Sequence, residues 1–219
     1  MDGIDVVCFS GCTWQAVKGE LSRLGLIDDF MPGAIPAVAP QPQQDNDAPR
    51  RVANIWRTTT PLTGTLGEKY FAEVRGLGPI GDLDAVRWHK DLRAIVALMT
   101  DPVSGAPRGI HRTFLNADGT KRERMMLGNA GVVRLTPDED VVLGLGIAEG
   151  VEDSIAILSS GWAPVWACLS CGGIERLPVL SGIEALTVFH DRDDAGTRAA
   201  EACAARWTAA GREAALHGR

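Results

Sequence analysis

The stretches IAEGVED at residues 147–153 and TVFHDRDDAGTRAA at residues 187–200 decide the fold of the C-terminal half. Each begins as an apolar run typical of a buried strand and ends in a glycine-flanked cluster of acids. Strand-like runs at 141–148, 164–169, 185–189 and 214–217 alternate with helical patterns at 151–158 and 200–210. Strands separated by helices pair in parallel through right-handed crossovers, which predicts an α/β fold with an open parallel sheet and flanking helices.

Acidic residues follow the first and third of these strands, where open α/β sheets place their sites. Glu149 comes directly after the first strand, and Asp191 and Asp193 come directly after the third. Acids after strands can also be helix caps and first-turn charges, and Glu152 and Asp194 fit that interpretation. Two clusters with E-G-x-x-D and D-x-D-x-x-G spacing are harder to attribute to capping. Since Mg²⁺ takes oxygen ligands and keeps several waters, the clusters predict a magnesium site.

Taken together, the two motifs resemble the Toprim domain shared by bacterial primases, topoisomerases and some nucleases. Residues 66–219 look like the Toprim-bearing primase-like proteins of phages and plasmids. The resemblance implies that Glu149, Asp191 and Asp193 are catalytic and hold Mg²⁺ or Mn²⁺. It also implies supporting roles in the two motifs for Gly150, Asp153, Asp194 and Gly196.

The chain divides into four segments by composition and pattern. Residues 1–30 resemble half of a zinc ribbon, residues 31–60 form a Pro-rich linker, residues 61–140 form a small mixed α+β basic subdomain, and residues 141–219 form the Toprim domain. Within the basic subdomain, Leu66, Tyr70 and Val74 fall on one helical stripe that stops at Gly76. Strands are expected at 94–99, 109–115 and 131–135, with a hairpin turn at 116–119.

The net charge of −6 conceals a strong asymmetry. Residues 87–134 hold nine Lys/Arg against four acids, so this segment carries +5 and the remainder −11. A solvated charged face and a nucleic-acid surface explain such a segment equally well from the sequence alone. The Toprim resemblance favours binding of template phosphate or nucleoside triphosphate by Arg108, His111, Arg112, Lys121, Arg122 and Arg124.

The five cysteines form an odd set in a chain without a secretion signal, which predicts reduced thiols in the cytoplasm. Cys8 and Cys12 are two ligands where a structural zinc site needs four, so no zinc is expected. Cys168 and Cys171 are interpreted as small buried thiols, although a site shared with Cys8 and Cys12 stays open. No stretch reaches the roughly 18 uncharged residues of a membrane span, so no membrane partner is expected.

The resemblance implies a primase-like nucleotidyltransferase that synthesises primers on single-stranded DNA from nucleoside triphosphates in phage or plasmid DNA replication. A Toprim-type nuclease is a second hypothesis, because the same metal site can activate water. The third hypothesis is a non-catalytic relative of a primase that binds DNA or a replication partner. Since the sequence lacks a P-loop, unwinding would fall to a partner such as a replicative helicase.

Overall fold

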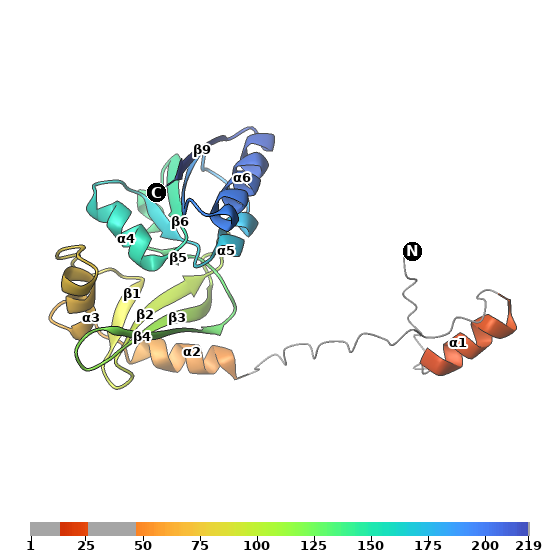
Figure 1. Cartoon of the computed structure of the whole chain (residues 1–219), viewed down its shortest axis with the longest axis horizontal. Helices are drawn as coiled ribbons and strands as arrows, with labels where there is room; N and C mark the ends of the chain where they lie inside the picture. The colour runs from red at the N-terminus through yellow and green to blue at the C-terminus, as the bar shows by residue number, and fades with distance from the viewer. Residues whose placement is uncertain (1–13, 26–46, 219) are drawn as a thin grey trace. The chain divides into compact units, whose positions relative to one another are not determined.

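The computed structural model describes residues 14–25 and 47–218 (Figure 1). The chain divides into two units, Met1–Gln44 and Asp45–Arg219. In the first unit the described part is helix α1 (Trp14–Arg23), where Arg23 forms an ion pair with Glu20 one turn away. Cys8 and Cys12, the predicted half zinc ribbon, lie outside the described residues, as does the linker up to residue 46. Among the described residues no helix is long and apolar enough to cross a membrane.

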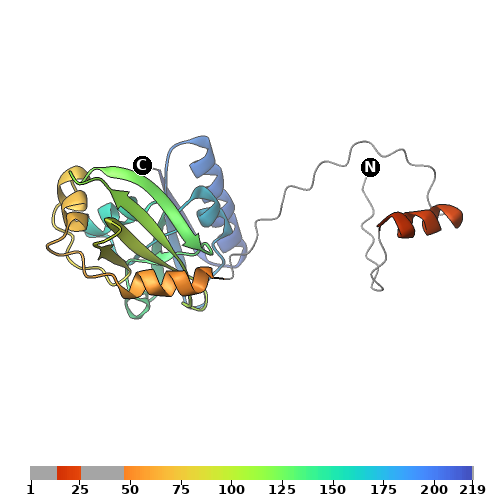
Figure 2. The ribbon, with the colours of Figure 1, turned by 90° about the horizontal axis from the view of Figure 1, so that it is seen from below.

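Helix α2 (Ala48–Arg57) corrects the C-terminal limit of the predicted linker. Pro49, one of the prolines that suggested a linker, lies in the first turn of the helix, where the missing N–H costs no intrahelical hydrogen bond. The buried Ala48 and Val52 pack on one face of an antiparallel sheet with Ile110, Phe114 and Leu127. Figure 2 shows this helix lying across the strands. Residues 48–57 are therefore part of the folded unit.

The antiparallel sheet has the order β1-β2-β3-β4. Its strands are Val86–His89, Ala94–Thr100, Pro107–Leu115 and Lys121–Gly128. The predicted strands at 94–99 and 109–115 are confirmed, and so is the turn, where the Asn116 N–H donates to the Thr120 carbonyl. Gly119 takes a φ of 87° there, which an L-residue rarely adopts.

A short helical segment covers the opposite face of this sheet. Helix α3 (Leu66–Lys69), capped by Thr65, continues as the π-helix η1 (Tyr70–Val74). The predicted apolar stripe is correct for Tyr70, which is buried, and wrong for Val74, which is 46% exposed. The wider π turn, in which the Arg75 N–H donates to the Tyr70 carbonyl, rotates the last residues off the stripe. Gly76, with φ of 68°, follows the end of the helix as expected.

The second sheet has the order β5-β7-β6-β8-β9. The strands are Val133–Arg134, Gly144–Ala148, Val165–Ala167, Ala185–His190 and Glu213–Gly218, and all but the antiparallel edge strand β5 pair in parallel. The predicted parallel sheet is confirmed. The run at 131–135, predicted as part of the basic subdomain, instead supplies β5 to this second sheet, because Val133 pairs with Ala167. A 3₁₀ turn (Asp138–Asp140) leads into β6.

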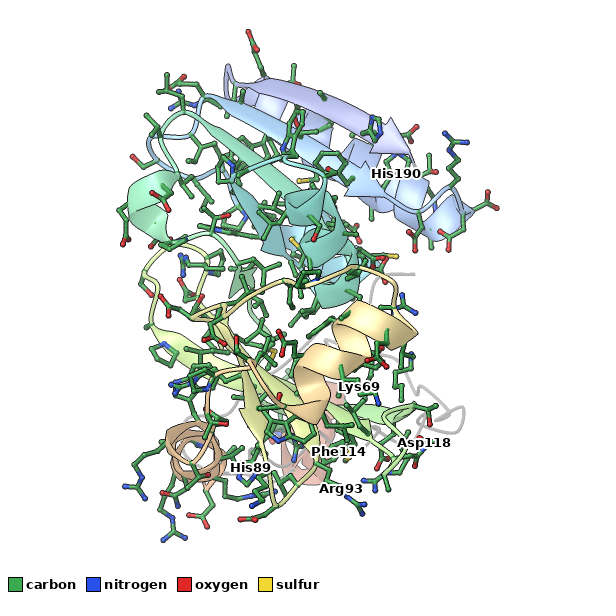
Figure 3. The ribbon with its side chains drawn as sticks, turned by 90° about the vertical axis from the view of Figure 1, so that its left-hand side faces the viewer. Lys69, His89, Arg93, Phe114, Asp118 and His190 are labelled. Carbon is green, nitrogen blue, oxygen red and sulfur yellow. The ribbon has the colours of Figure 1, made fainter. Side chains whose placement is uncertain are left out.

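Helices cover both faces of the parallel sheet (Figure 1). On one face α5 (Cys171–Arg176) and α6 (Asp194–Ala209) enclose a core that includes Ile147, Val188 and Trp207. On the other face lies α4 (Val151–Ser159), whose Val151 and Ile155 belong to one apolar cluster with Tyr70, Phe71 and Leu115. The two sheets therefore share a core through α4. Figure 3 shows the parallel sheet with His190 above, and the antiparallel sheet with His89 and Phe114 below.

Candidate metal centre and nucleic-acid surface

The predicted acidic residues follow two strands that are direct neighbours. Strands β6 and β8 pair in parallel with Ala148 opposite Phe189, so Glu149 is one residue beyond this pair and Asp191 is two. Because the two strands run in the same direction, the residues that follow them lie at the same edge of the sheet. No group of three His, Cys, Asp or Glu among residues 14–25 and 47–218 is gathered closely enough to hold a metal ion.

Glu149 has a partner that the sequence did not suggest. The Cys171 thiol, at the start of α5, donates a hydrogen bond to Glu149 Oε2 over 2.9 Å. This hydrogen bond, partial burial and the charges of Glu149 and Asp193 raise the pKa of Cys171 to about 11. The prediction of a small buried thiol therefore holds for Cys168, which is buried in the core, and is wrong for Cys171, which belongs to the acidic site.

Asp193 also has a structural task. Its Oδ1 accepts the Gly196 backbone N–H over 2.7 Å and so caps α6. A Cβ at Gly196 would lie 2.6 Å from the Asp191 carbonyl oxygen, so only glycine allows this tight turn. Asp193 is thus the N-cap of α6, and Asp194 is an acid of its first turn, as expected. Because the cap uses Oδ1, Oδ2 is the atom of Asp193 that can turn to a cation.

In the first acidic motif, residues 149–153, the side chain of Asp153 lies against Gly150. A Cβ at Gly150 would lie 2.2 Å from Asp153 Oδ2, so the Asp153 carboxylate folds back over this glycine. Gly150 precedes α4 in an extended conformation and carries no side-chain cap. The arrangement fits the supporting roles predicted for both residues. Carboxylate oxygens from Glu149, Asp191 and Asp193 are the donor type that Mg²⁺ takes, and this ion completes its shell with water and substrate phosphate.

Glu152 lies in the first turn of α4, as expected, but it is 5% exposed and links the two sheets. Its Oε1 accepts the Tyr70 hydroxyl over 3.1 Å and pairs with Arg124 Nη2 at 3.3 Å. The buried His111 faces the same carboxylate, and its pKa is lowered by burial, an effect that Glu152 opposes. No local pattern in the sequence signalled this network, because Tyr70 and Arg124 are 82 and 28 residues from Glu152.

The six predicted nucleic-acid residues do not form one surface. His111 and Arg124 lie on the face of the antiparallel sheet that meets α4, beside Glu152. Arg112 and Arg122 both contact the ring of Phe114, on the face covered by α2. Arg108 pairs with Asp101 at 2.8 Å. His111 and Arg112 are neighbours on β3 and therefore point to opposite faces of the sheet.

Helix α2 brings a cation that the linker interpretation missed. Arg51 lies near enough to Arg112 for its charge, after burial, to lower the pKa of Arg112. Arg112 Nη2 donates to the Met126 carbonyl over 3.3 Å, while its Nε is buried without a hydrogen-bond partner among the described residues. The face around Phe114 therefore concentrates positive charge from Arg51, Arg112 and Arg122.

Comparison with known protein families gives two matches, one for each half of the folded unit. Residues 144–217 match the Toprim domain, and residues 46–134 match a domain of unknown function, DUF7146. The two matches therefore fall on separate stretches of one folded unit. No curated protein sequence matches it.

Several solved primase structures are similar to the chain at low sequence identity. The Aquifex aeolicus primase (zinc-binding and RNA polymerase domains) is 19% identical, with a TM-score of 0.40 over 61% of this chain and 36% of that one. The primase fragment of the bacteriophage T7 primase-helicase protein is 15% identical, with a TM-score of 0.43 over 62% of this chain and 55% of that one. A DnaG primase catalytic domain bound to single-stranded DNA is 16% identical, with a TM-score of 0.42 over 58% and 44%. The chain thus spans between about a third and just over half of these structures.

Proposed function

We propose that the chain is a primase-like nucleotidyltransferase that synthesises primers on single-stranded DNA in phage or plasmid replication in the cytoplasm. The observation that supports this proposal is that Glu149 follows β6 and Asp191 and Asp193 follow the neighbouring parallel strand β8, within the stretch that matches the Toprim domain. The acidic edge belongs to the same folded unit as a sheet rich in arginine. Acids for a cation and cations for phosphate are the two requirements of phosphoryl transfer.

Glu149, Asp191 and Asp193 would hold Mg²⁺ or Mn²⁺, which would neutralise the charge that develops on the transferred phosphoryl group. The Cys171 hydrogen bond orients Glu149, and the α6 cap restrains Asp193, so both carboxylates are held before substrate arrives. Lys121, Arg122, Arg112 and Arg108 would hold template or triphosphate through charge-assisted hydrogen bonds. Strand separation would be left to a replicative helicase.

A primer-synthesis assay tests this function. Purified protein is mixed with single-stranded circular DNA, labelled ribonucleotides and Mg²⁺, and the products are separated by length. Asp191→Asn should abolish short labelled products, while Glu201→Gln, an exposed acid on α6, should leave them unchanged. Fragmentation of the circular DNA without incorporation would favour the nuclease. Binding without either reaction would favour the non-catalytic relative.

A further inference from the structure

A pocket of about 390 Å³ opens between the antiparallel sheet and the loop that follows strand β7. Arg108 and Met126 line it from β3 and β4, and Leu169, Ser170 and Arg176 line it from the loop and α5. A volume of this size is within the range of roughly 300–1,000 Å³ that holds small ligands. Of the residues that line it, Arg108 is one of the predicted phosphate-binding residues, whereas Ser170 and Arg176 had no predicted role.

The charge of this pocket is positive. Arg108 and Arg176 contribute to its wall, and no carboxylate is among the described residues that line it. Arg108 is paired with Asp101, which lies outside the wall, through Nη1 alone. For Arg176 no described carboxylate lies within ion-pair distance, and its Nη1 would be 2.9 Å from a Cβ added at Gly172. The guanidinium thus lies along the glycine backbone.

The loop that forms one wall is tightly built. Leu169 has a φ of 67°, a conformation that costs an L-residue free energy and that concentrates at functional sites. Gly173 admits no side chain, because a Cβ there would lie 2.0 Å from the Cys168 carbonyl oxygen. Ser170 Oγ accepts the Gly173 N–H over 3.0 Å, so its hydroxyl hydrogen is left to donate to a ligand. The wall is therefore preorganised for a hydrogen-bond acceptor.

The pocket also lies beside the acidic site. Cys171, the residue after Ser170, donates its hydrogen bond to Glu149. A ligand held against Ser170 and Arg176 is thus next to the loop that orients Glu149. A guanidinium group binds phosphate through two parallel hydrogen bonds. Two guanidinium groups in the wall of one pocket without acids therefore favour an anionic ligand over a cationic or neutral one.

We propose that Arg108 and Arg176 form a phosphate-binding clamp in this pocket, with Ser170 as a further donor. This inference rests on the proposed function, because the phosphate would belong either to an incoming nucleoside triphosphate or to the DNA strand. Arg176 is the new element, since it lies on α5 of the Toprim domain, outside the basic segment that the sequence identified.

The test measures binding of two probes by fluorescence anisotropy, without catalysis. The probes are a fluorescent ATP analogue and a fluorescent oligothymidylate, each titrated with the parent chain, Arg176→Ala, Arg176→Lys and Arg198→Ala. Arg198 is an exposed arginine on α6 that does not line the pocket, so it controls for net charge. Arg176→Ala should weaken the binding of one or both probes about tenfold. Arg176→Lys should restore only part of this affinity, because lysine keeps the charge but lacks the planar fork. Arg198→Ala should have little effect on binding.

The two probes distinguish the sources of phosphate. Loss confined to the ATP analogue assigns the clamp to the nucleotide, and loss confined to oligothymidylate assigns it to the strand. Equal affinities of the folded Arg176→Ala and parent chains for both probes would overturn the clamp, as would an equal loss in Arg198→Ala. If Arg176→Ala weakened binding but the parent chain made no primer, the clamp would stand and the nucleotidyltransferase function would be refuted.

Discussion

Glu152 and Tyr70 are joined by a buried hydrogen bond of 3.1 Å that connects helix α4 of the Toprim domain to the helical segment covering the antiparallel sheet. Arg124 donates to the same carboxylate oxygen from β4. Two segments, 82 and 28 residues away along the chain, therefore meet at the Glu152 carboxylate. Because a buried carboxylate without partners is costly, this network makes the relative position of the two sheets a condition of stability.

The first prediction concerns Tyr70 at alkaline pH. Burial, followed by the charge and hydrogen bond of Glu152, raises the pKa of Tyr70 to about 12, compared with about 10 in an unfolded chain. The protonated hydroxyl therefore contributes stability that is fully present below about pH 10 and is lost as the pH rises toward 12. Since the chain contains one tyrosine, tyrosinate absorbance reports this residue alone.

Tyr70→Phe should lower the free energy of unfolding at pH 8 by about 1 kcal/mol, the net value of one hydrogen bond, and should flatten the loss between pH 10 and 12. Chemical denaturation of both proteins at pH 8 and across pH 10 to 12 measures the two effects. Titration of the folded parent with a midpoint near pH 10 would contradict the buried network.

The second prediction separates the two tasks of Asp193. Asp193→Asn should keep the α6 cap, because asparagine caps as well as aspartate, and should abolish the rise in melting temperature that Mg²⁺ produces in the parent. Asp193→Ala should lose the Mg²⁺ response and also about 1 kcal/mol of stability without metal. Thermal denaturation with and without Mg²⁺ compares the variants. An intact Mg²⁺ response in Asp193→Asn would remove this residue from the metal site.

The third prediction distinguishes Arg122 from Arg124. Arg122 pairs with its exposed neighbour Glu123 and contacts Phe114, so Arg122→Ala should preserve stability and reduce the salt slope of single-stranded DNA binding by about 0.7. Arg124→Ala should instead destabilise the fold by about 1–3 kcal/mol, because Glu152 stays buried without its cation. Salt titrations and denaturation curves on both variants are required. If Arg122→Ala lowered stability and Arg124→Ala changed only DNA binding, Glu152 would not depend on Arg124.

The fourth prediction concerns the thiol of Cys171. Since the hydrogen bond to Glu149 raises its pKa to about 11, the thiol stays protonated at neutral pH and should react slowly with iodoacetamide. Glu149→Gln should bring the pKa down and speed the reaction at pH 8. Peptide mass spectrometry follows Cys171 separately from Cys168 and Cys203, which are buried. An equal rate in both proteins would argue against the contact.

The placement of the acidic residues after the strands was largely predictable, because it follows from local order along the chain. The apolar runs before Glu149 and Asp191 define two strands, and acids directly after parallel strands must lie at the same sheet edge. Helix α2 was missed because Pro49 and its neighbours have the composition of a linker, and its apolar face is recognisable only against Ile110 and Phe114. The contribution of Cys171 was missed because the donor and Glu149 are 22 residues apart.

The sequence by itself determined the parallel sheet, the hairpin and the strand ends that carry Glu149, Asp191 and Asp193, since periodicity and turn residues act over a few neighbouring positions. Only the tertiary structure decided that Glu152 is a buried link instead of a surface charge, and that the basic residues divide between two faces of one sheet. It also decided that Arg108 and Arg176 share a pocket. The physical reason is that burial and pairing depend on packing between segments distant along the chain, which no local pattern records.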